Sequence, residues 1–362
     1  MTNRPGPPIA MLAELTHRCP LSCPYCSNPL ELVARDREMS TDVWESVFHA
    51  AADLGVLQLH LSGGEPASRR DLEDLVKAAR EARLYVNLIT SGIGLTPKRL
   101  DALEAAGLDH VQLSLQATTA EKADWIGGYS GAFARKVAFA AEVCRRGVPL
   151  TVNAVMHRHT IDDIEHAIAF AADLGARRVE IACVQFYGWA LANRAALLPS
   201  RDQVLRAKDV VAGARAAYAG RMTIDFVPPD YYADYPKACM GGWGSTGINI
   251  APDGTVLPCH AAATIPGLQF DRVTDRNLAE IWYDGSAFNA FRGHEWMQDP
   301  CRSCARRDRD HGGCRCQAMA LASDPSVTDP VCRHSPARSV VDDAISQTAA
   351  SPPPFKYRTL AQ

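Results

Sequence analysis

The run CPLSCPYC, from Cys19 to Cys26, decides the fold, because it directly follows residues 9–15, which we expect to form a strand. Three thiolates this close in one loop can hold three corners of a cubane iron–sulfur cluster. The loop has no fourth cysteine, so one iron is left for a chelating ligand, and the amino and carboxylate groups of S-adenosylmethionine (SAM) suit that position. The alternative is a zinc loop in which His17 supplies the fourth ligand.

Strand-like and helix-like segments alternate around this loop, from residue 10 to about residue 226. Such alternation implies right-handed parallel βαβ units. Six or seven units are fewer than a closed eight-stranded barrel needs, so we expect an α/β fold, a partial, open barrel of (βα)6 type, with its chemistry at the carboxyl ends of the strands. The expected strands are 9–15, 56–61, 85–90, 110–115, 150–155, 178–182 and 222–226, and the expected helices are 41–54, 71–83, 97–106, 133–146, 161–174 and 201–219.

Charge and composition exclude several classes of function. The chain has 362 residues, with 38 basic and 41 acidic side chains and a net charge of −3. A nucleic-acid enzyme needs a basic excess, so we expect no DNA or RNA substrate. No apolar run approaches the ~18 residues of a membrane span, and the start has no apolar signal-peptide region, so we expect a cytoplasmic protein. In that reducing compartment, the twelve cysteines favour metal binding over disulfides.

Polar and glycine residues at the ends of later strands are candidates for binding the cofactor. Gly63 and Gly64 follow the second strand and permit close approach of backbone to a ligand, and Glu65 can accept a hydrogen bond from an ammonium group. Ser114 and Asn153 lie on the fourth and fifth strands. The alternative is that these residues form an ordinary turn and ordinary strand-end hydrogen bonds.

A second group of cysteines lies between residues 239 and 332, in a segment rich in Cys, Gly and Arg with little helical period. Such a segment cannot build a large apolar core and needs metal to hold it together. We therefore divide the chain into a barrel over 1–228, a metal-stapled domain over 229–340 and a C-terminal tail over 341–362, in which 351–357 is extended. The cysteines of the second group are Cys239, Cys259, Cys301, Cys304, Cys314, Cys316 and Cys332.

The cysteine loop, with an aromatic residue before its third cysteine, resembles the signature of the radical SAM family. The resemblance implies that Cys19, Cys23 and Cys26 bind a [4Fe-4S] cluster with SAM. It also implies that Tyr25 lies near the adenine and that Gly63, Gly64 and Glu65 bind the SAM ammonium group. Ser114 and Asn153 would contact the ribose or the methionine part of SAM.

The second group resembles the SPASM extension of radical SAM enzymes, which carries two auxiliary iron–sulfur clusters, here [4Fe-4S] or [2Fe-2S]. Asp310 stands where that family has the third cysteine of its middle run. A carboxylate is a harder donor than a thiolate and is easier to displace. The alternative is that Asp310 is a solvated acid among arginines. Carried over residue by residue, one cluster takes Cys301, Cys304, Asp310 and Cys332, and the other takes Cys239, Cys259, Cys314 and Cys316.

Longer strings are similar to the peptide cyclases of pyrroloquinoline quinone (PQQ) biosynthesis. The resemblance implies reductive cleavage of SAM to a 5′-deoxyadenosyl radical, which joins a Glu and a Tyr side chain of the precursor peptide PqqA through a carbon–carbon bond. It also implies the peptide chaperone PqqD and an electron donor such as flavodoxin as partners. The strings are AELTHRCP (13–20), CSNPLEL (26–32), YGWA (187–190) with Asn193 and Arg194, PDYY (229–232), GGW (241–243) and LPCHA (257–261).

Two other functions stay open from the sequence. Another SPASM-type peptide maturase, forming a thioether or oxidising a side chain, would keep every cluster motif. A non-enzymatic, metal-stapled interaction protein belongs to a different class, and iron content with SAM cleavage would separate it. Because the first cluster cysteine is residue 19, we expect no peptide-binding domain before the barrel and a partner that presents the peptide.

Overall fold

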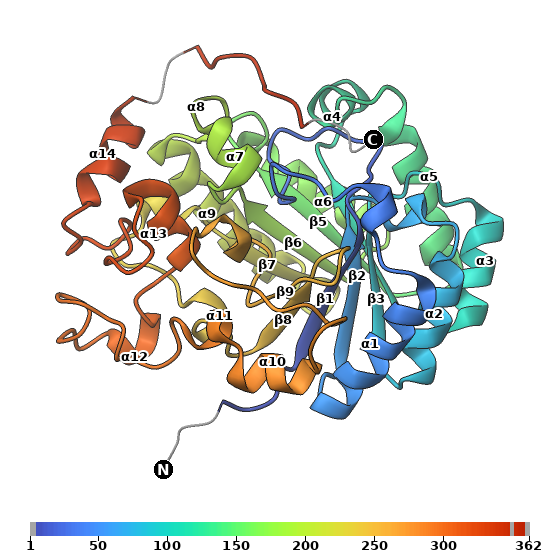
Figure 1. Ribbon diagram of the computed structural model, residues 1–362. Helices are drawn as coiled ribbons and strands as arrows, with labels where there is room; N and C mark the ends of the chain where they lie inside the picture. Colours follow the sequence, from blue (N-terminus) through green and yellow to red (C-terminus); the bar gives the residue numbers. More distant parts are fainter. Residues whose placement is uncertain (1–4, 348–350, 359–362) are drawn as a thin grey trace.

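The computed structural model describes residues 5–347 and 351–358, and they form a nine-stranded sheet in the order β7-β6-β5-β4-β3-β2-β1-β8-β9 (Figure 1). Every neighbouring pair from β7 to β8 is parallel, and β9 is antiparallel to β8. The seven predicted strands all exist, so the α/β prediction is confirmed. The strands are β1 Ala10–Thr16, β2 Gln58–Gly63, β3 Tyr85–Thr90, β4 His110–Leu115, β5 Leu150–Met156, β6 Arg178–Cys183, β7 Thr223–Val227, β8 Gly247–Ile250 and β9 Val256–Leu257.

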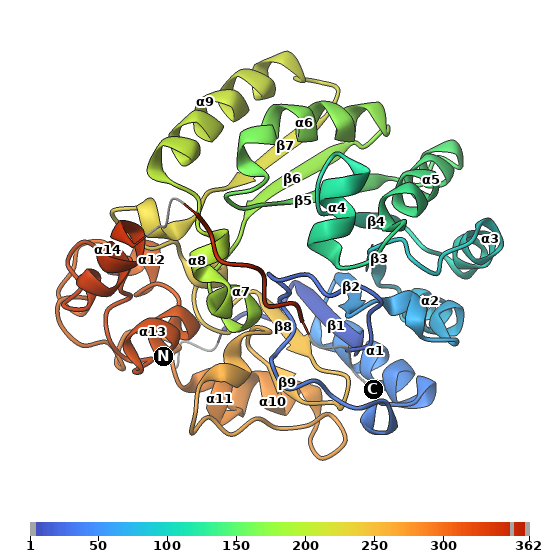
Figure 2. The same ribbon diagram turned by 90° about the horizontal axis from the view of Figure 1, so that it is seen from above.

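Helices between the parallel strands cover the outside of the curved sheet (Figure 2). Local sequence sets their ends: the Ser40 side chain accepts from the backbone N–H of Val43 at the start of α1, and Gly55 ends α1 with a φ of 111°. The helices of this layer are α1 Thr41–Leu54, α2 Leu72–Glu81, α3 Pro97–Ala106, α5 Ala132–Arg145, α6 Ile164–Asp173 and α9 Arg201–Ala217.

Several short helices were not predicted. Figure 1 shows α4, α7 and α8 at the end of the sheet where the strands finish. They lie in the connections after β4 and β6, so they add walls to the region where a barrel of this kind has its chemistry. Their bounds are α4 Ala120–Gly127, α7 Gly188–Ala192 and α8 Arg194–Leu197; the 3-10 turns are η1 Arg35–Arg37, η2 Pro66–Ser68, η3 Ile161–Asp163, η4 Asp230–Tyr232, η5 Cys239–Gly241 and η6 Ala262–Thr264.

The C-terminal region has more regular structure than its composition indicated. β8 extends the sheet beside β1, with Ala10 opposite Gly247, and Trp282 and Phe288 are fully buried in the same core as the strands. The expectation of little helical period is therefore wrong, because apolar side chains three and four residues apart in α10 bury one face. The boundary at residues 228 and 229 stays a prediction. The helices are α10 Leu278–Asp284, α11 Ser286–Asn289, α12 Arg307–Asp310, α13 Arg315–Ala322 and α14 Arg338–Ser346.

The predicted tail begins inside α14, and residues 351–358 then run without helix or strand. Residues 348–350 and 359–362 of the tail lie outside the described residues. In Figure 2 the described end of the tail crosses the mouth of the barrel beside α7 and α8 and reaches the loop after β1. This segment therefore becomes part of the wall of the site.

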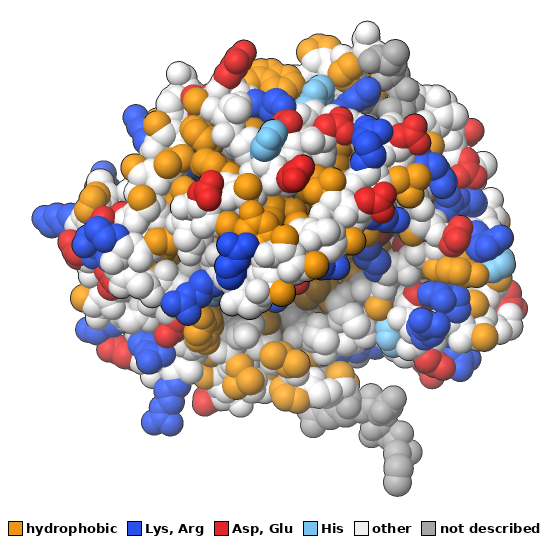
Figure 3. All heavy atoms as spheres, turned by 180° about the vertical axis from the view of Figure 1, so that it is seen from behind, with side chains coloured by type: hydrophobic (Ala, Val, Ile, Leu, Met, Phe, Trp, Pro, Cys, Tyr) orange, Lys and Arg blue, Asp and Glu red, His pale blue; other side chains and the backbone are white. Residues whose placement is uncertain are grey.

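On the face that Figure 3 shows, basic and acidic side chains are interspersed, in agreement with the small net charge. Among residues 5–347 and 351–358, none of the helices combines the length and the apolar character needed to cross a bilayer.

Candidate active site

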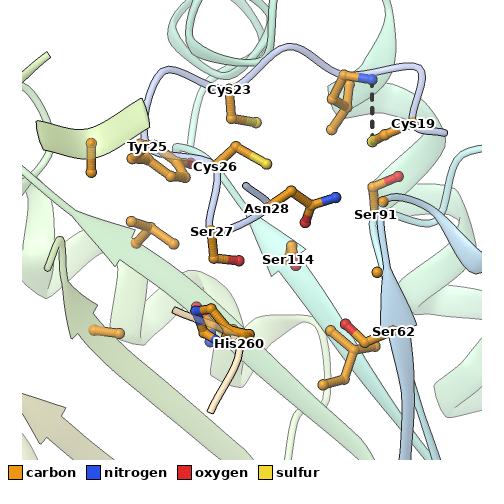
Figure 4. Close-up of a pocket in the computed structure, with 18 of the residues that line it drawn as sticks. Cys19, Cys23, Tyr25, Cys26, Ser27, Asn28, Ser62, Ser91, Ser114 and His260 are labelled. Carbon is orange, nitrogen blue, oxygen red and sulfur yellow. Dashed lines mark hydrogen bonds between the residues drawn. The ribbon is translucent and has the colours of Figure 1, made fainter. Parts of the chain in front are cut away.

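A cavity of about 470 Å³ opens at the carboxyl ends of β1 to β6. This size falls within the range of small-molecule and cofactor sites. Figure 4 shows that the side chains of Cys19, Cys23 and Cys26 point into the same part of this cavity, with Ser114 and His260 on the opposite side. The structure thus brings the three predicted cluster cysteines together at the end of the barrel where chemistry is expected.

The three cysteines of the loop are half-buried. Burial raises the pKa of Cys19 and of Cys23 to about 12, and it also raises the pKa of Cys26. Arg358 acts in the opposite direction on all three, because a nearby positive charge favours the thiolate. Binding a metal cluster would supply the further positive charge that three buried thiolates need. The residues present therefore fit a three-thiolate iron–sulfur cluster.

The two glycines at the end of β2 contact the backbone that leads into the cysteine loop. A Cβ atom on Gly63 would lie 2.3 Å from the carbonyl oxygen of Thr16, and one on Gly64 would lie 2.3 Å from that of Arg18. The Gly64 N–H donates to the Thr16 carbonyl at 2.6 Å, and the Glu65 N–H donates to the Arg18 carbonyl at 2.8 Å. Because only glycine permits this approach, the Gly-Gly-Glu segment fixes the start of the cysteine loop against β2.

The Glu65 carboxylate is bound by the end of β3. One carboxylate oxygen accepts from the Thr90 hydroxyl at 2.7 Å, and the other accepts from the Ser91 N–H at 2.6 Å. Glu65 is 1% exposed and is absent from the cavity lining. The structure therefore does not bring this carboxylate into the cavity, and its contact with a SAM ammonium group stays a prediction.

The other predicted cofactor residues line the cavity, together with one that sequence reasoning missed. Tyr25, Gly63, Gly64, Ser114 and Asn153 are all in the wall. Among the described residues, the buried Asn153 Oδ1 has no hydrogen-bond partner, so it remains available to a ligand.

Asn28 is the missed residue, and it also lines the cavity. Its buried Nδ2 has no partner among the described residues, although an amide nitrogen in such a place normally donates a hydrogen bond. Its position two residues after Cys26 was the available indication.

Two buried cations near the cysteine loop were also missed. Lys136 of α5 is 1% exposed and its Nζ donates to the Ser114 carbonyl at 3.0 Å. Burial lowers the pKa of Lys136, whereas Cys23 and Glu65 act to raise it. Arg358 of the C-terminal segment is 2% exposed and lines the cavity. Both side chains place a cationic group near Cys19 and Cys23, where positive charge favours the thiolate.

The far wall of the cavity contains a hydrogen-bonded pair, Tyr187 and His260. The Tyr187 hydroxyl lies 2.6 Å from Nε2 of His260. Burial raises the pKa of Tyr187, and Cys259, Cys314, Cys316 and Cys26 raise it further. Tyr187 therefore lies between the cysteine loop and the second group of cysteines.

Four cysteines of the second group pack against one another. The Cys259 and Cys316 sulfurs lie 3.7 Å apart, and Cys314 shares hydrogen bonds with Cys239 and Cys316. Hydrogen bonding to these neighbours lowers the pKa of Cys314. The four residues are those that the sequence assigned to one auxiliary cluster, including the unusual Cys316.

The remaining predicted ligands surround a separate small cavity. Cys301, Cys304, Asp310 and Cys332 all line it. Asp310 is 8% exposed, and its Oδ2 lies 3.4 Å from Nε of Arg306. A solvated acid would be exposed, so the buried position favours the interpretation of Asp310 as a ligand, which stays a prediction.

The zinc interpretation of the first loop is not supported by His17. Its Nδ1 accepts from the Val33 N–H at 2.9 Å, and its Nε2 lies 3.0 Å from a carboxylate oxygen of Glu14. Both ring nitrogens therefore already have partners. In the described part of the chain, no three His, Cys, Asp or Glu side chains are arranged to hold a single metal ion.

Comparisons with known proteins narrow this chemistry. The model of the radical SAM superfamily matches residues 13–171, and that of an iron–sulfur cluster-binding domain, SPASM, matches residues 239–305. The chain is 69% identical to the PqqA peptide cyclase of Ruegeria pomeroyi, over 91% of this chain and 88% of that protein. It is 57% identical to the PqqA peptide cyclase of Rhizobium meliloti, over 97% of this chain and 94% of that protein.

Solved structures share the fold. SuiB of Streptococcus suis bound to S-adenosylmethionine has a TM-score of 0.76 at 19% identity, over 91% of this chain and 78% of that chain. Fold, cavity and family models together define a radical SAM enzyme with a C-terminal SPASM region. At 69% identity over most of both proteins the assignment is more specific: the chain belongs to the PqqA peptide cyclase family of PQQ biosynthesis. The family resemblance seen in the sequence is confirmed.

Proposed function

We propose that this enzyme joins a Glu and a Tyr side chain of PqqA through a carbon–carbon bond, using SAM bound at the Cys19, Cys23 and Cys26 cluster. The observation that carries the proposal is the convergence of three cysteines on a cavity whose walls hold polar atoms without partners. A [4Fe-4S] cluster with bound SAM supplies the 5′-deoxyadenosyl radical when it is reduced. The protein's part is to bind, orient and shield the reacting groups.

We assign the cavity residues by their position. Cys19, Cys23 and Cys26 would hold the cluster, and an iron without a cysteine would be free to bind the amino and carboxylate groups of SAM. Tyr25, Ser114 and Asn153 line the volume beside the cysteines and are proposed to contact the nucleoside and methionine parts. The Gly63, Gly64 and Glu65 segment positions the cysteine loop by its backbone contacts and is proposed to lie near the SAM ammonium group.

Two auxiliary clusters, of four or two irons each, complete the proposed cofactor set. Their ligands are Cys239, Cys259, Cys314 and Cys316 in one and Cys301, Cys304, Asp310 and Cys332 in the other. Adding the Glu carbon radical to the Tyr ring leaves the ring with one electron and one proton to lose before it is aromatic again; an auxiliary cluster would accept the electron, and the proton would pass to a base or to water. The position of Tyr187 and His260 between the cavity and Cys259 supports that direction of transfer.

The partners follow from the family. A structural neighbour, SuiB, has been crystallised with its precursor peptide SuiA. We propose PqqA as the peptide of this enzyme, PqqD as the chaperone that presents it, and an electron donor such as flavodoxin. The cytoplasm, where thiols stay reduced, is the proposed compartment.

The test is anaerobic incubation with SAM, reductant, PqqA and PqqD, followed by tandem mass spectrometry. We expect a PqqA product lighter by one H₂, with fragment ions that place the link between Glu and Tyr. A thioether or an oxidised side chain in the product would instead indicate another kind of peptide maturase. Absence of both 5′-deoxyadenosine and product from protein with full iron content would overturn the proposal.

A further inference from the structure

The C-terminal segment 351–358 reaches the cysteine loop, although more than three hundred residues of sequence separate them (Figure 2). The Asn193 side chain joins the two. Its Oδ1 accepts from the Lys356 N–H at 2.7 Å, while its Nδ2 donates to the Lys356 carbonyl at 2.8 Å and to the Pro24 carbonyl at 2.9 Å. Asn193 is 3% exposed, and hydrogen bonds are stronger in the low dielectric of such a buried site than in water.

Aromatic side chains dock the segment on the barrel. The ring of Phe355 stacks on Trp125 with centroids 4.5 Å apart, and it meets His157 edge-on at 6.2 Å. His157 in turn lies 5.5 Å from the ring of Tyr25, inside the cysteine loop. The Tyr357 hydroxyl donates to the Trp125 carbonyl at 2.8 Å. The segment is therefore packed against the site.

Arg358 makes the decisive contacts. Its guanidinium donates to the His17 carbonyl at 3.2 Å and to the Leu21 carbonyl at 3.3 Å, and its backbone N–H donates to the Ser22 carbonyl at 3.1 Å. One planar group thus spans the turn that contains Cys19, a geometry that arginine provides and lysine does not. Its buried Nε has no partner among the described residues, so a donor remains for an anionic ligand in the cavity.

We propose that Arg358 is a positioning residue of the radical SAM site: it fixes the backbone of the cysteine loop and supplies positive charge to the thiolates. The C-terminal segment is then part of the active site. This inference rests on the proposed cluster at Cys19, Cys23 and Cys26. Loss of the segment would affect this cluster and leave the auxiliary clusters, which have other neighbours, in place.

The test compares Arg358→Gln, Arg358→Lys and Lys356→Ala. Lys356 is the matched control, because its exposed side chain is a neighbouring cation and only its backbone contacts Asn193. Hydrogen exchange in the peptide covering residues 17–26 is measured on the metal-free chain. For Arg358→Gln we expect about tenfold faster exchange, the factor that losing one charge-assisted hydrogen bond implies.

Iron content after reconstitution is the second readout. In Arg358→Gln it should fall by about four irons, one cluster, while the auxiliary-cluster EPR stays unchanged. Arg358→Lys should keep the charge but still show faster exchange of the loop. Wild-type exchange and iron content in Arg358→Gln would overturn the proposal, and so would full restoration of loop protection by lysine.

The design separates failure of this inference from failure of the proposed function. Hydrogen exchange of the loop is measured on the metal-free chain, so it tests the role of Arg358 whatever reaction the enzyme catalyses. Failure of the wild-type enzyme to cleave SAM would contradict the proposed function and not the role of Arg358. If Arg358→Gln also loses its auxiliary clusters, Phe355→Ala provides the test, because it loosens the segment without altering a contact to the loop backbone. The same faster exchange is then expected, and unchanged exchange would overturn the proposal.

Discussion

The cysteine loop and the second group of cysteines use the same residue type in opposite ways. In the loop, three thiols face a cavity of about 470 Å³ whose walls carry polar atoms without partners. In the second group, Cys239, Cys259, Cys314 and Cys316 contact one another, with 3.7 Å between two of the sulfurs. The three thiols of the loop thus face open volume, whereas these four cysteines face one another.

If both regions bind iron–sulfur clusters as proposed, this difference assigns them different tasks. A metal site with all positions taken by protein is structural or transfers electrons, whereas one with an open position can bind and activate a substrate. Both regions have cations beside their cysteines: Lys136 and Arg358 lie near the cysteine loop, and the buried Arg315 lies near Cys314. We therefore expect substitutions in the two regions to have different effects on SAM cleavage and on product formation.

Replacing Cys19, Cys23 and Cys26 together by Ala should have the largest effect. We expect loss of SAM cleavage and of about four irons, because no other residue of the loop replaces the thiolates. EPR of the auxiliary clusters should persist. Cys144→Ala is the control, since the Cys144 thiol donates to the Leu174 carbonyl on the outer layer of the barrel. Formation of 5′-deoxyadenosine by the triple variant would contradict the claim that SAM is cleaved at the cysteine loop.

Asp310→Ala should impair cross-linking but not the open site. Asp310 shares a cavity with Cys301, Cys304 and Cys332. Removing its carboxylate should alter the auxiliary EPR spectrum and lower the yield of product, while SAM cleavage without product continues. Asp308→Ala is the matched control two residues away, because the Asp308 side chain is 68% exposed. Equal spectra and yields for the two variants would support the solvated-acid interpretation of Asp310.

Tyr187→Phe tests the connection between the two regions. It removes the hydroxyl that bonds to His260 and leaves His260 without that partner. We expect product formation per SAM cleaved to fall by about tenfold, the cost of one buried hydrogen bond. Tyr232→Phe is the control, since its hydroxyl donates to the Pro199 carbonyl away from the cavity. An unchanged ratio of product to 5′-deoxyadenosine would show that the Tyr187 hydroxyl does not connect the two regions.

Acid should destabilise the folded protein through His157. Burial, with a smaller contribution from the nearby His159 and Lys122, lowers the pKa of His157 from 6.5 to about 3. Below pH 6.5 the unfolded chain binds one more proton than the folded one, so the free energy of unfolding falls as the pH falls. Between pH 7 and pH 5 this loss is about 2 kcal/mol.

Urea unfolding at both pH values checks this effect. His157→Asn, which removes the titrating ring, should lose about 2 kcal/mol less than the wild type over this interval. His49→Asn, at an exposed position of α1, should behave as the wild type does. Equal losses in the wild type and in His157→Asn would mean that another group controls acid stability.

The sequence predicted most of the barrel because its strands and helices carry local patterns. The predicted ranges 85–90, 110–115 and 41–54 agree with β3, β4 and α1 residue by residue. The ligand sets that the resemblance to the SPASM family implied also lie together in space, which the sequence alone could not have shown. Asp310 lines the same cavity as three of these cysteines, and its role as a ligand stays a prediction.

Contacts between distant segments could not be predicted. Arg358 carries no local pattern that connects it to Cys19, and Asn193 clamps the segment through backbone atoms of Lys356, which any residue would offer. The orientation of Glu65 depends on Thr90 and Ser91, which follow a different strand. The apolar face of α10 was overlooked because the cysteines and arginines around it dominate the composition.

Titration of the reduced enzyme with SAM, followed by EPR, tests the central claim most directly. We predict that SAM changes the EPR spectrum of one cluster and leaves both auxiliary spectra unchanged. The spectrum that changes should be the one that is absent from the Cys19, Cys23 and Cys26 triple variant. The claim that SAM binds at the Cys19, Cys23 and Cys26 cluster would be contradicted if SAM bound without changing this spectrum. It would also be contradicted if SAM changed a spectrum that the Cys314→Ala variant lacks.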